Sequence, residues 1–111
     1  ALVIEEGIKG HLKYADQLVS KWNENDQEVK DELQLWLHWW RDLMMIKIGM
    51  PNLVVCSSQL NKFYEKIDTY DMDHILMSIT AIQETLDCLD HNVNPKLAIP
   101  YMVLAIGSKK P

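Results

Sequence analysis

Apolar residues recur at steps of three and four along most of this chain, which is the periodicity of an amphipathic helix. The first stripe predicts a helix over residues 2–23, and a polar break follows in which Asn25 or Asp26 caps the next helix. The stripe consists of Ile4, Ile8, Leu12, Ala15, Leu18, Val19 and Trp22.

A second helix is predicted over residues 27–48. Its first half is apolar on one side only, but from Leu35 onward apolar side chains occur nearly all round. A helix of that kind is normally a central one, enclosed by other helices or by another subunit. Gly49 ends the helix and Pro51 prevents its resumption.

A loop over 50–57 and a short helix over 58–67 come next in the prediction. The longest regular stripe follows, because Asp71 is a good N-cap and the three-four alternation then continues to Val93. The expected inner face of this helix is Met72, Ile75, Leu76, Ile79, Ile82, Leu86, Leu89 and Val93.

The stretch 92–98 stops one helix and starts another. Asn94 is the expected cap, and Pro95 occupies the first helical position, where its missing N–H costs nothing. Pro100 cannot donate a hydrogen bond and should kink or delay this fifth helix. Its expected inner face is Leu97, Tyr101, Leu104 and Ala105. The fold class predicted for residues 1–111 is therefore all-α, a single five-helix bundle without a sheet.

The composition of the chain argues against several classes of function. With 111 residues the chain makes one domain, and only four Gly and four Pro interrupt it. The net charge of −5, with Arg41 as the only arginine, argues against a domain that binds duplex DNA by itself. No apolar run is long enough to span a membrane, and no signal peptide is visible. The chain starts without Met, so we expect a piece excised from a longer protein.

No pattern in the sequence assigns catalytic, cofactor-binding or metal-binding residues. A carboxylate-bridged metal site in a bundle needs Glu-x-x-His motifs, and the chain has none. The pair Asp71 and His74 is interpreted as an N-cap beside a surface histidine. Asp87 and His91 are interpreted as surface residues, and Cys88 near His91 as a partly buried, inert thiol. Glycine-rich phosphate loops are also lacking.

The two cysteines form no ligand-like cluster. Cys56 and Cys88 are therefore expected to be reduced thiols of a cytosolic protein.

The densest cluster of unusual residues is His38, Trp39, Trp40 and Arg41. The candidate interface residues are Trp36, Trp39, Trp40 and Arg41. Two interpretations remain open. The tryptophans can pack in the core while Arg41 pairs with an acid or extends into solvent. Alternatively the cluster is a subunit interface, where Trp and Arg are over-represented. Arg41 has no acidic residue at the favourable helical spacings, so its partner must come from another helix or another chain.

Two strings of residues carry a resemblance to a known family. Arg41-Asp-Leu-Met-Met-Ile-Lys-Ile-Gly49 closes one helix, and Asn92-Val-Asn-Pro-Lys-Leu-Ala98 opens the last. Their order and separation resemble the C-terminal domain of the bacterial DNA polymerase III delta-prime subunit, and the resemblance extends over most of the chain. The helix over 2–23 fits by position only.

That resemblance implies an assembly role. Members of this family belong to the sliding-clamp loader, a cytoplasmic pentamer of AAA+ subunits whose C-terminal helical domains pack into a collar. Delta-prime is usually a stator without ATPase activity. The chain would be the collar domain alone, without a cofactor, contacting gamma/tau and delta subunits. DNA and the clamp would be reached only through missing N-terminal domains.

The motif residues carried over are Arg41, Asp42, Asn92, Asn94 and Pro95, with structural or interface roles. Two departures from the family pattern are Pro100 and the heavy pair Trp39-Trp40. The runner-up readings are a gamma/tau-type collar and a helical adaptor unrelated to replication, with a small helical enzyme or metal-binding bundle third. An assembly domain predicts an exposed apolar patch of several hundred square ångströms in the isolated chain.

Overall fold

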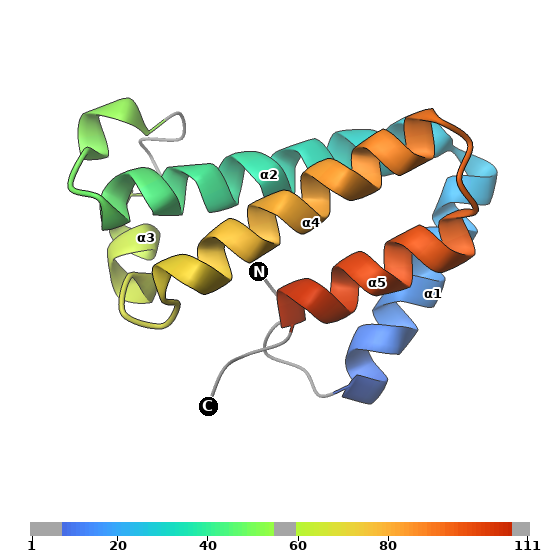
Figure 1. Cartoon of the computed structure of the whole chain (residues 1–111), viewed down its shortest axis with the longest axis horizontal. Helices are drawn as coiled ribbons and strands as arrows, with labels where there is room; N and C mark the ends of the chain where they lie inside the picture. The colour runs from blue at the N-terminus through green and yellow to red at the C-terminus, as the bar shows by residue number, and fades with distance from the viewer. Residues whose placement is uncertain (1–7, 55–59, 108–111) are drawn as a thin grey trace.

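The computed structural model describes residues 8–54 and 60–107, which form helices joined by short links (Figure 1). The four long helices are α1 (Ile8–Glu24), α2 (Asp26–Lys47), α4 (Met72–Asp90) and α5 (Pro95–Gly107). A 3-10 turn, η2 (Pro51–Leu53), and a short helix, α3 (Leu60–Lys66), lie between α2 and α4. The all-α class is confirmed, and the described residues contain no strand.

The bundle is built from four helices, so the prediction of a five-helix bundle is wrong. α1 packs against α2 and α5, and α4 packs against α2 and α5, which joins the four in a closed ring of contacts. Figure 1 shows α4 and α5 side by side, with α1 crossing behind α5. The seven residues of α3 make about two turns, too short for a core-facing stripe, and they pack against α2 at one end of the molecule.

Local capping chemistry sets where the long helices begin. The side-chain oxygen of Asn25 accepts from the backbone N–H of Glu28 at 3.2 Å, and Asp71 accepts from His74 at 2.7 Å. Asn94 accepts from the N–H of Lys96 at 2.9 Å, directly before Pro95. These bonds satisfy helix N–H groups that have no partner within their own helix. The predicted caps are confirmed, and residues 2–7 and 58–59 of the predicted helices lie outside the described part.

Two left-handed residues end α2 and α4 in the same way. Gly49 has φ +84°, and the N–H of Met50 donates to the carbonyl of Met45 at 2.8 Å. Asn92 has φ +59°, and Val93 donates to Cys88 at 2.9 Å. Both are Schellman motifs, in which a residue with positive φ lets the chain fold back onto the last helical carbonyls. Gly49 is the predicted stop, and Asn92 shows how the 92–98 stretch stops α4.

The core lies where α2, α4 and α5 meet, with α1 closing one side. The fully buried large side chains of this core come from α2, α4 and α5. Those from α2 are Val29, Leu33, Trp40 and Leu43; those from α4 and α5 are Ile75, Ile82, Ile99, Met102, Val103 and Ile106.

The predicted inner face of α5 is wrong. Ile99, Met102, Val103 and Ile106 are buried, whereas Leu97 and Tyr101 are 70% and 62% exposed. Because α5 is apolar nearly all round, its sequence does not select a face, and packing between α1 and α4 decides which side is buried. The helix also runs unbroken from Pro95 through Pro100, so Pro100 does not delay it.

Three other helices differ from prediction in single positions. In α1, His11 is buried and its neighbour Leu12 is 43% exposed. In α4, Leu76 is exposed, and Val93 is exposed too because the helix ends at Asp90, before this predicted position. In α2, Leu35 is 68% exposed, so the chain's own helices do not enclose α2 as expected of a central helix.

Candidate assembly surface

Trp40 belongs to the core. It is fully buried, and its ring meets those of Trp39 and Tyr70 edge-on, with ring centroids 5.0 Å and 5.1 Å away. Trp36 is half-buried and stacks on Tyr14 of α1, with centroids 5.7 Å apart and planes 17° from parallel. Trp36 and Trp40 therefore join α2 to neighbouring parts of the chain, and Trp40 offers no surface to another subunit.

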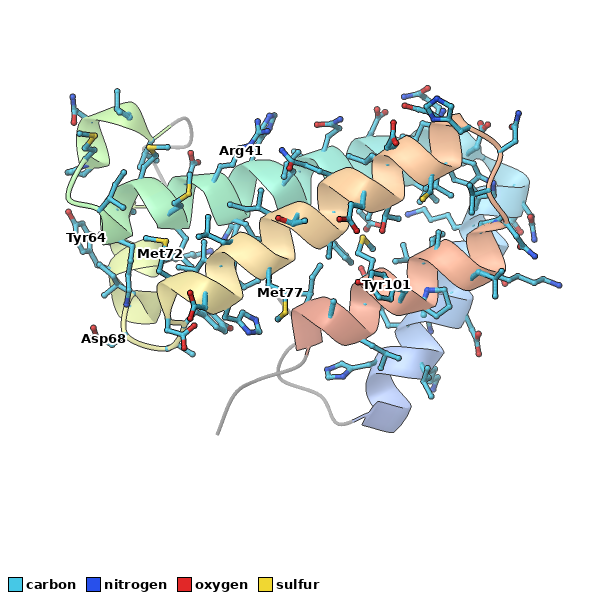
Figure 2. The ribbon with its side chains drawn as sticks, in the orientation of Figure 1. Arg41, Tyr64, Asp68, Met72, Met77 and Tyr101 are labelled. Atoms are coloured by element: carbon cyan, nitrogen blue, oxygen red, sulfur yellow. The ribbon has the colours of Figure 1, made fainter. Side chains whose placement is uncertain are left out.

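Arg41 and Asp42 lie next to each other on α2 but point to opposite environments. Arg41 is exposed and extends away from the bundle (Figure 2), whereas Asp42 is 2% exposed. No ion pair involves Arg41 within residues 8–54 and 60–107. Of the four candidate interface residues, Arg41 is thus the one whose whole polar group is available to a partner.

The motif residues of the 92–98 stretch have structural roles. Asn92 ends α4 in the left-handed conformation, Asn94 caps α5, and Pro95 is its first residue. None of these three lines either of the two hollows described below. Their function is to set the sharp reversal between α4 and α5, which places those helices side by side.

The histidine beside the Asp71 cap is not on the surface. His74 is 2% exposed, and its Nε2 donates to the carbonyl of Ile106 at 3.0 Å. Its ring also stacks on Tyr70, with centroids 5.4 Å apart. The prediction of a surface histidine is therefore wrong, because α5 ends directly over this first turn of α4. His74 holds the end of α5 in place.

A second buried histidine was missed by sequence reasoning. His11 of α1 is 5% exposed, and its ring lies against Gly107 at the end of α5. A Cβ placed on Gly107 would be 2.5 Å from Cε1 of His11. The sequence gives only a weak signal for this burial. His11 directly precedes Leu12, and Gly107, against which the His11 ring lies, is at the other end of the described chain.

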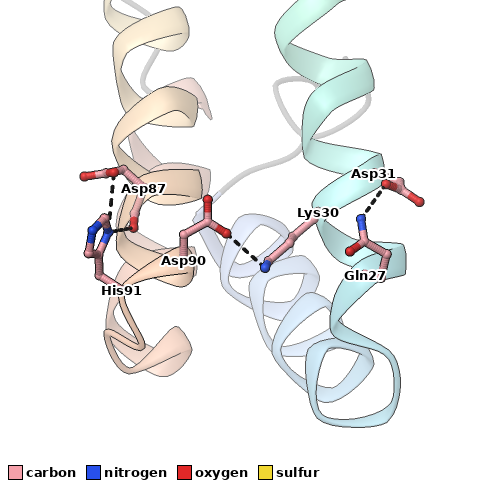
Figure 3. Close-up of polar contacts among 6 residues, drawn as sticks. All are labelled: Gln27, Lys30, Asp31, Asp87, Asp90 and His91. Atoms are coloured by element: carbon pink, nitrogen blue, oxygen red, sulfur yellow. Dashed lines mark hydrogen bonds and ion pairs between the residues drawn. The ribbon is translucent and has the colours of Figure 1, made fainter.

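The other predicted polar groups are where the sequence placed them. His91 and Asp87 are exposed, and Nδ1 of His91 donates to the Asp87 carbonyl at 2.8 Å (Figure 3). This hydrogen bond, together with the Asp87 charge, raises the pKa of His91. Cys88 is a partly buried free thiol, as predicted, and Cys56 lies outside the described residues.

Ion pairs connect the helices at the end of the bundle where α4 stops. Lys30 of α2 reaches Asp90 of α4 at 2.9 Å (Figure 3), and its hydrogen bond to Asp90 raises the pKa of Lys30. Lys21 of α1 pairs with Glu28 of α2 at 3.1 Å, which raises the pKa of Lys21. Such exposed pairs contribute little to stability, so their main effect is on surface charge.

The fold changes the ionisation of Tyr14. Burial against α2, and secondarily the charge of Glu32, raises the pKa of Tyr14 to about 12. The side chain is therefore a neutral phenol at physiological pH. Together with its stacking on Trp36, this indicates a packing role.

An apolar groove lies between α4 and α5 on the described surface. We call it the α4/α5 groove; its volume is about 270 Å³, and it is lined by Leu76, Met77, Thr80, Ala81, Glu84, Tyr101 and Ala105. Figure 2 shows Met77 and Tyr101 on the side of the molecule where α4 and α5 lie next to each other. Leu76, Met77 and Tyr101 are all exposed although they are large and apolar.

A second hollow has a different character. It lies between α1 and α5, has a volume of about 430 Å³, and is lined by Asp16, Val19, Ser20, Asn23, Lys96 and Pro100. Its mixed charges and polar side chains are typical of solvated surface. The α4/α5 groove is therefore the better candidate for contact with another protein.

Comparison with protein families, curated proteins and solved structures gives no match. Function must then be argued from the residues themselves. Among the residues that the structure describes, no three His, Cys, Asp or Glu side chains gather where they could hold one metal ion. None of the described helices is long and apolar enough to cross a membrane.

Proposed function

We propose that this chain is a non-catalytic protein assembly domain, and specifically the collar domain of a delta-prime-type clamp-loader subunit. The observation that carries the proposal is the exposed apolar groove between α4 and α5. The resemblance of the strings 41–49 and 92–98 to the delta-prime family supplies the specific identity. In that role the chain supports the loading of a sliding clamp in the cytoplasm.

The groove supports an assembly role because its apolar residues are gathered on one face. Single exposed apolar side chains are ordinary on protein surfaces, but contiguous ones mark sites of contact. Leu76, Met77 and Tyr101 line one groove, and Leu104 follows Tyr101 by one helical turn while being 38% exposed. Tyrosine and methionine are also enriched at protein interfaces.

The two strings support the delta-prime identity through the positions they occupy. The first string ends α2 at Gly49, and the second ends α4 at Asn92 and begins α5 at Pro95. Both therefore specify helix ends, which fix the lengths and directions of the helices that carry the exposed surface. Arg41, the exposed member of the first string, supplies a charged group for a neighbouring subunit.

A gamma/tau-type collar domain and an adaptor unrelated to replication are the alternatives. The same apolar groove would serve either alternative, so the three candidate functions are distinguished by which partner the chain binds. The test is to mix the purified chain with gamma/tau and delta subunits of the same organism and measure the complexes by sedimentation velocity. Co-sedimentation with the gamma–delta mixture supports the delta-prime role. If the chain sediments alone in every mixture at micromolar concentration, the clamp-loader proposal is refuted.

A further inference from the structure

The α4/α5 groove has the size of an anchor site. Its lining combines the small residues Ala81 and Ala105 with the large residues Leu76, Met77 and Tyr101. Its volume of about 270 Å³ exceeds the roughly 150 Å³ of an engineered apolar cavity that accommodates benzene. One bulky apolar side chain fits there with room for part of a second.

The direction of the groove favours a helix as its occupant. On α4 the lining residues Met77, Ala81 and Glu84 follow one another at steps of four and three, and on α5 Tyr101 and Ala105 are four apart. The groove thus runs along both helices for more than one turn. A third helix that lies in such a groove inserts side chains at matching helical spacing.

The charge at the rim indicates which kind of helix. α4 contains no Lys or Arg, and its exposed acids are Asp73 in the first turn and Glu84, Asp87 and Asp90 further along. Asp90 is paired with Lys30 and Asp87 with His91. Glu84 lines the groove and forms no ion pair inside the described part of the chain. A partner that carries Lys or Arg beside its apolar anchor would complement this carboxylate.

The same charges argue against a second copy of this chain. Two copies that met groove to groove would bring two Glu84 carboxylates into one interface, and each copy carries a net charge of −5. Like charges placed together at an interface are costly. The occupant is therefore a different protein with a basic surface.

We infer that the α4/α5 groove receives an amphipathic helix of a neighbouring subunit, which inserts a bulky apolar side chain between Met77 and Tyr101 and pairs a Lys or Arg with Glu84. This inference rests on the proposed assembly function and names the surface and the chemistry of the partner.

The first test uses groove variants in the mixture of gamma/tau and delta subunits. The double variant Met77→Ser, Tyr101→Ser should weaken binding about thirtyfold, and Glu84→Lys about tenfold, because hot-spot truncations and reversed charges at an interface have effects of this size. The matched control is Leu35→Ser, which removes a similarly exposed apolar side chain from α2. Unchanged binding by both groove variants would overturn the inference while leaving the assembly function standing.

The second test does not depend on clamp-loader subunits. A synthetic amphipathic helical peptide of Leu, Ala and Lys is titrated into the isotope-labelled chain, and NMR shifts are followed; a second peptide has Glu in place of every Lys. The Lys peptide should shift the resonances of Met77, Ala81, Tyr101 and Ala105, and the Glu84→Lys chain should instead prefer the Glu peptide. Shifts that map elsewhere, or a preference that Glu84→Lys does not change, would refute the inference.

The two tests separate the two proposals. If wild-type chain ignores gamma/tau and delta but the Lys peptide occupies the groove with the expected charge dependence, the clamp-loader function fails and the helix-binding groove stands. If assembly occurs and neither test involves the groove, the function stands and the groove inference fails. Circular dichroism of each variant checks that helix content is unchanged, and Glu84→Lys is a surface change that the fold tolerates.

Discussion

Replacing Gly107 with Ala should destabilise the protein because of one buried side chain. Gly107 is the last residue of α5, and a Cβ there would lie 2.5 Å from Cε1, 2.7 Å from Nδ1 and 2.8 Å from Nε2 of His11. Non-bonded carbon atoms normally rest at about 3.5–4.0 Å. The imidazole must therefore move by about 1 Å, although it is 95% buried between α1 and α5.

The expected loss follows from two opposing effects. Overpacking a filled site costs about 1–3 kcal/mol. Replacing glycine with alanine in a helix raises the free energy of unfolding by up to about 1 kcal/mol, and by less at a terminal residue. The free energy of unfolding should therefore fall by about 1–2 kcal/mol, which lowers the melting temperature by about 4–9 °C for a domain of this size.

The assay is urea denaturation followed by circular dichroism for four proteins: wild type, Gly107→Ala, His11→Ala and the double variant. In the His11→Ala background, the same Gly107→Ala change should be neutral or stabilising, because the obstacle is gone. This double-mutant cycle isolates the contact between the two residues. If Gly107→Ala costs the same in both backgrounds, or stabilises the wild type, the close approach of α5 to His11 is incorrect.

Three further changes test other features. Asn92→Ala should lower the free energy of unfolding by about 1 kcal/mol, whereas Asn92→Gly should be neutral or stabilising, because Asn92 has φ +59°; urea melts that rank alanine above glycine would contradict this. Ser78→Ala should leave stability unchanged or raise it by up to about 1 kcal/mol, since the buried Ser78 hydroxyl has no hydrogen-bond partner among the described groups; a loss above 1 kcal/mol would reveal a missed bond. Tyr14 should ionise near pH 12 rather than 10 in an ultraviolet titration. Because folding raises the pKa of Tyr14, the neutral phenol contributes stability that is present below pH 10 and is lost as pH rises toward 12. The Tyr14→Phe variant should not show this loss of stability.

Helix ends were predictable from the sequence because each is determined by a few neighbouring residues. Asn25, Asp71 and Asn94 each accept a hydrogen bond from a backbone N–H two or three residues away, and Gly49 needs only its own freedom to adopt positive φ. These interactions depend on the local chain alone. Sequence reasoning therefore placed them correctly before any packing was known.

Helix faces were harder because they depend on partners far away in the sequence. On α5 two apolar faces compete, and the face with Ile99 and Met102 is buried while the one with Tyr101 is not. The burial of His74 depends partly on the end of α5, which reaches it from 32 residues later in the chain. The candidate site was hard to predict for the same reason, because the α4/α5 groove exists only where the second apolar face of α5 remains uncovered. Nothing in the local pattern of α4 or α5 distinguishes these outcomes.

The pairing of α1 with α5 also governs the order in which the chain can acquire its structure. During synthesis α1 leaves the ribosome before the other three long helices, and α5, with which it packs more extensively than with α2, follows after α4. Closing that contact requires the ends of nearly the whole domain to meet, which makes it a late and slow event among otherwise local helical contacts. Until then Ala15 and Leu18 have only part of their native cover. A nascent chain halted before α5 would therefore present the buried side of α1 to chaperones and proteases.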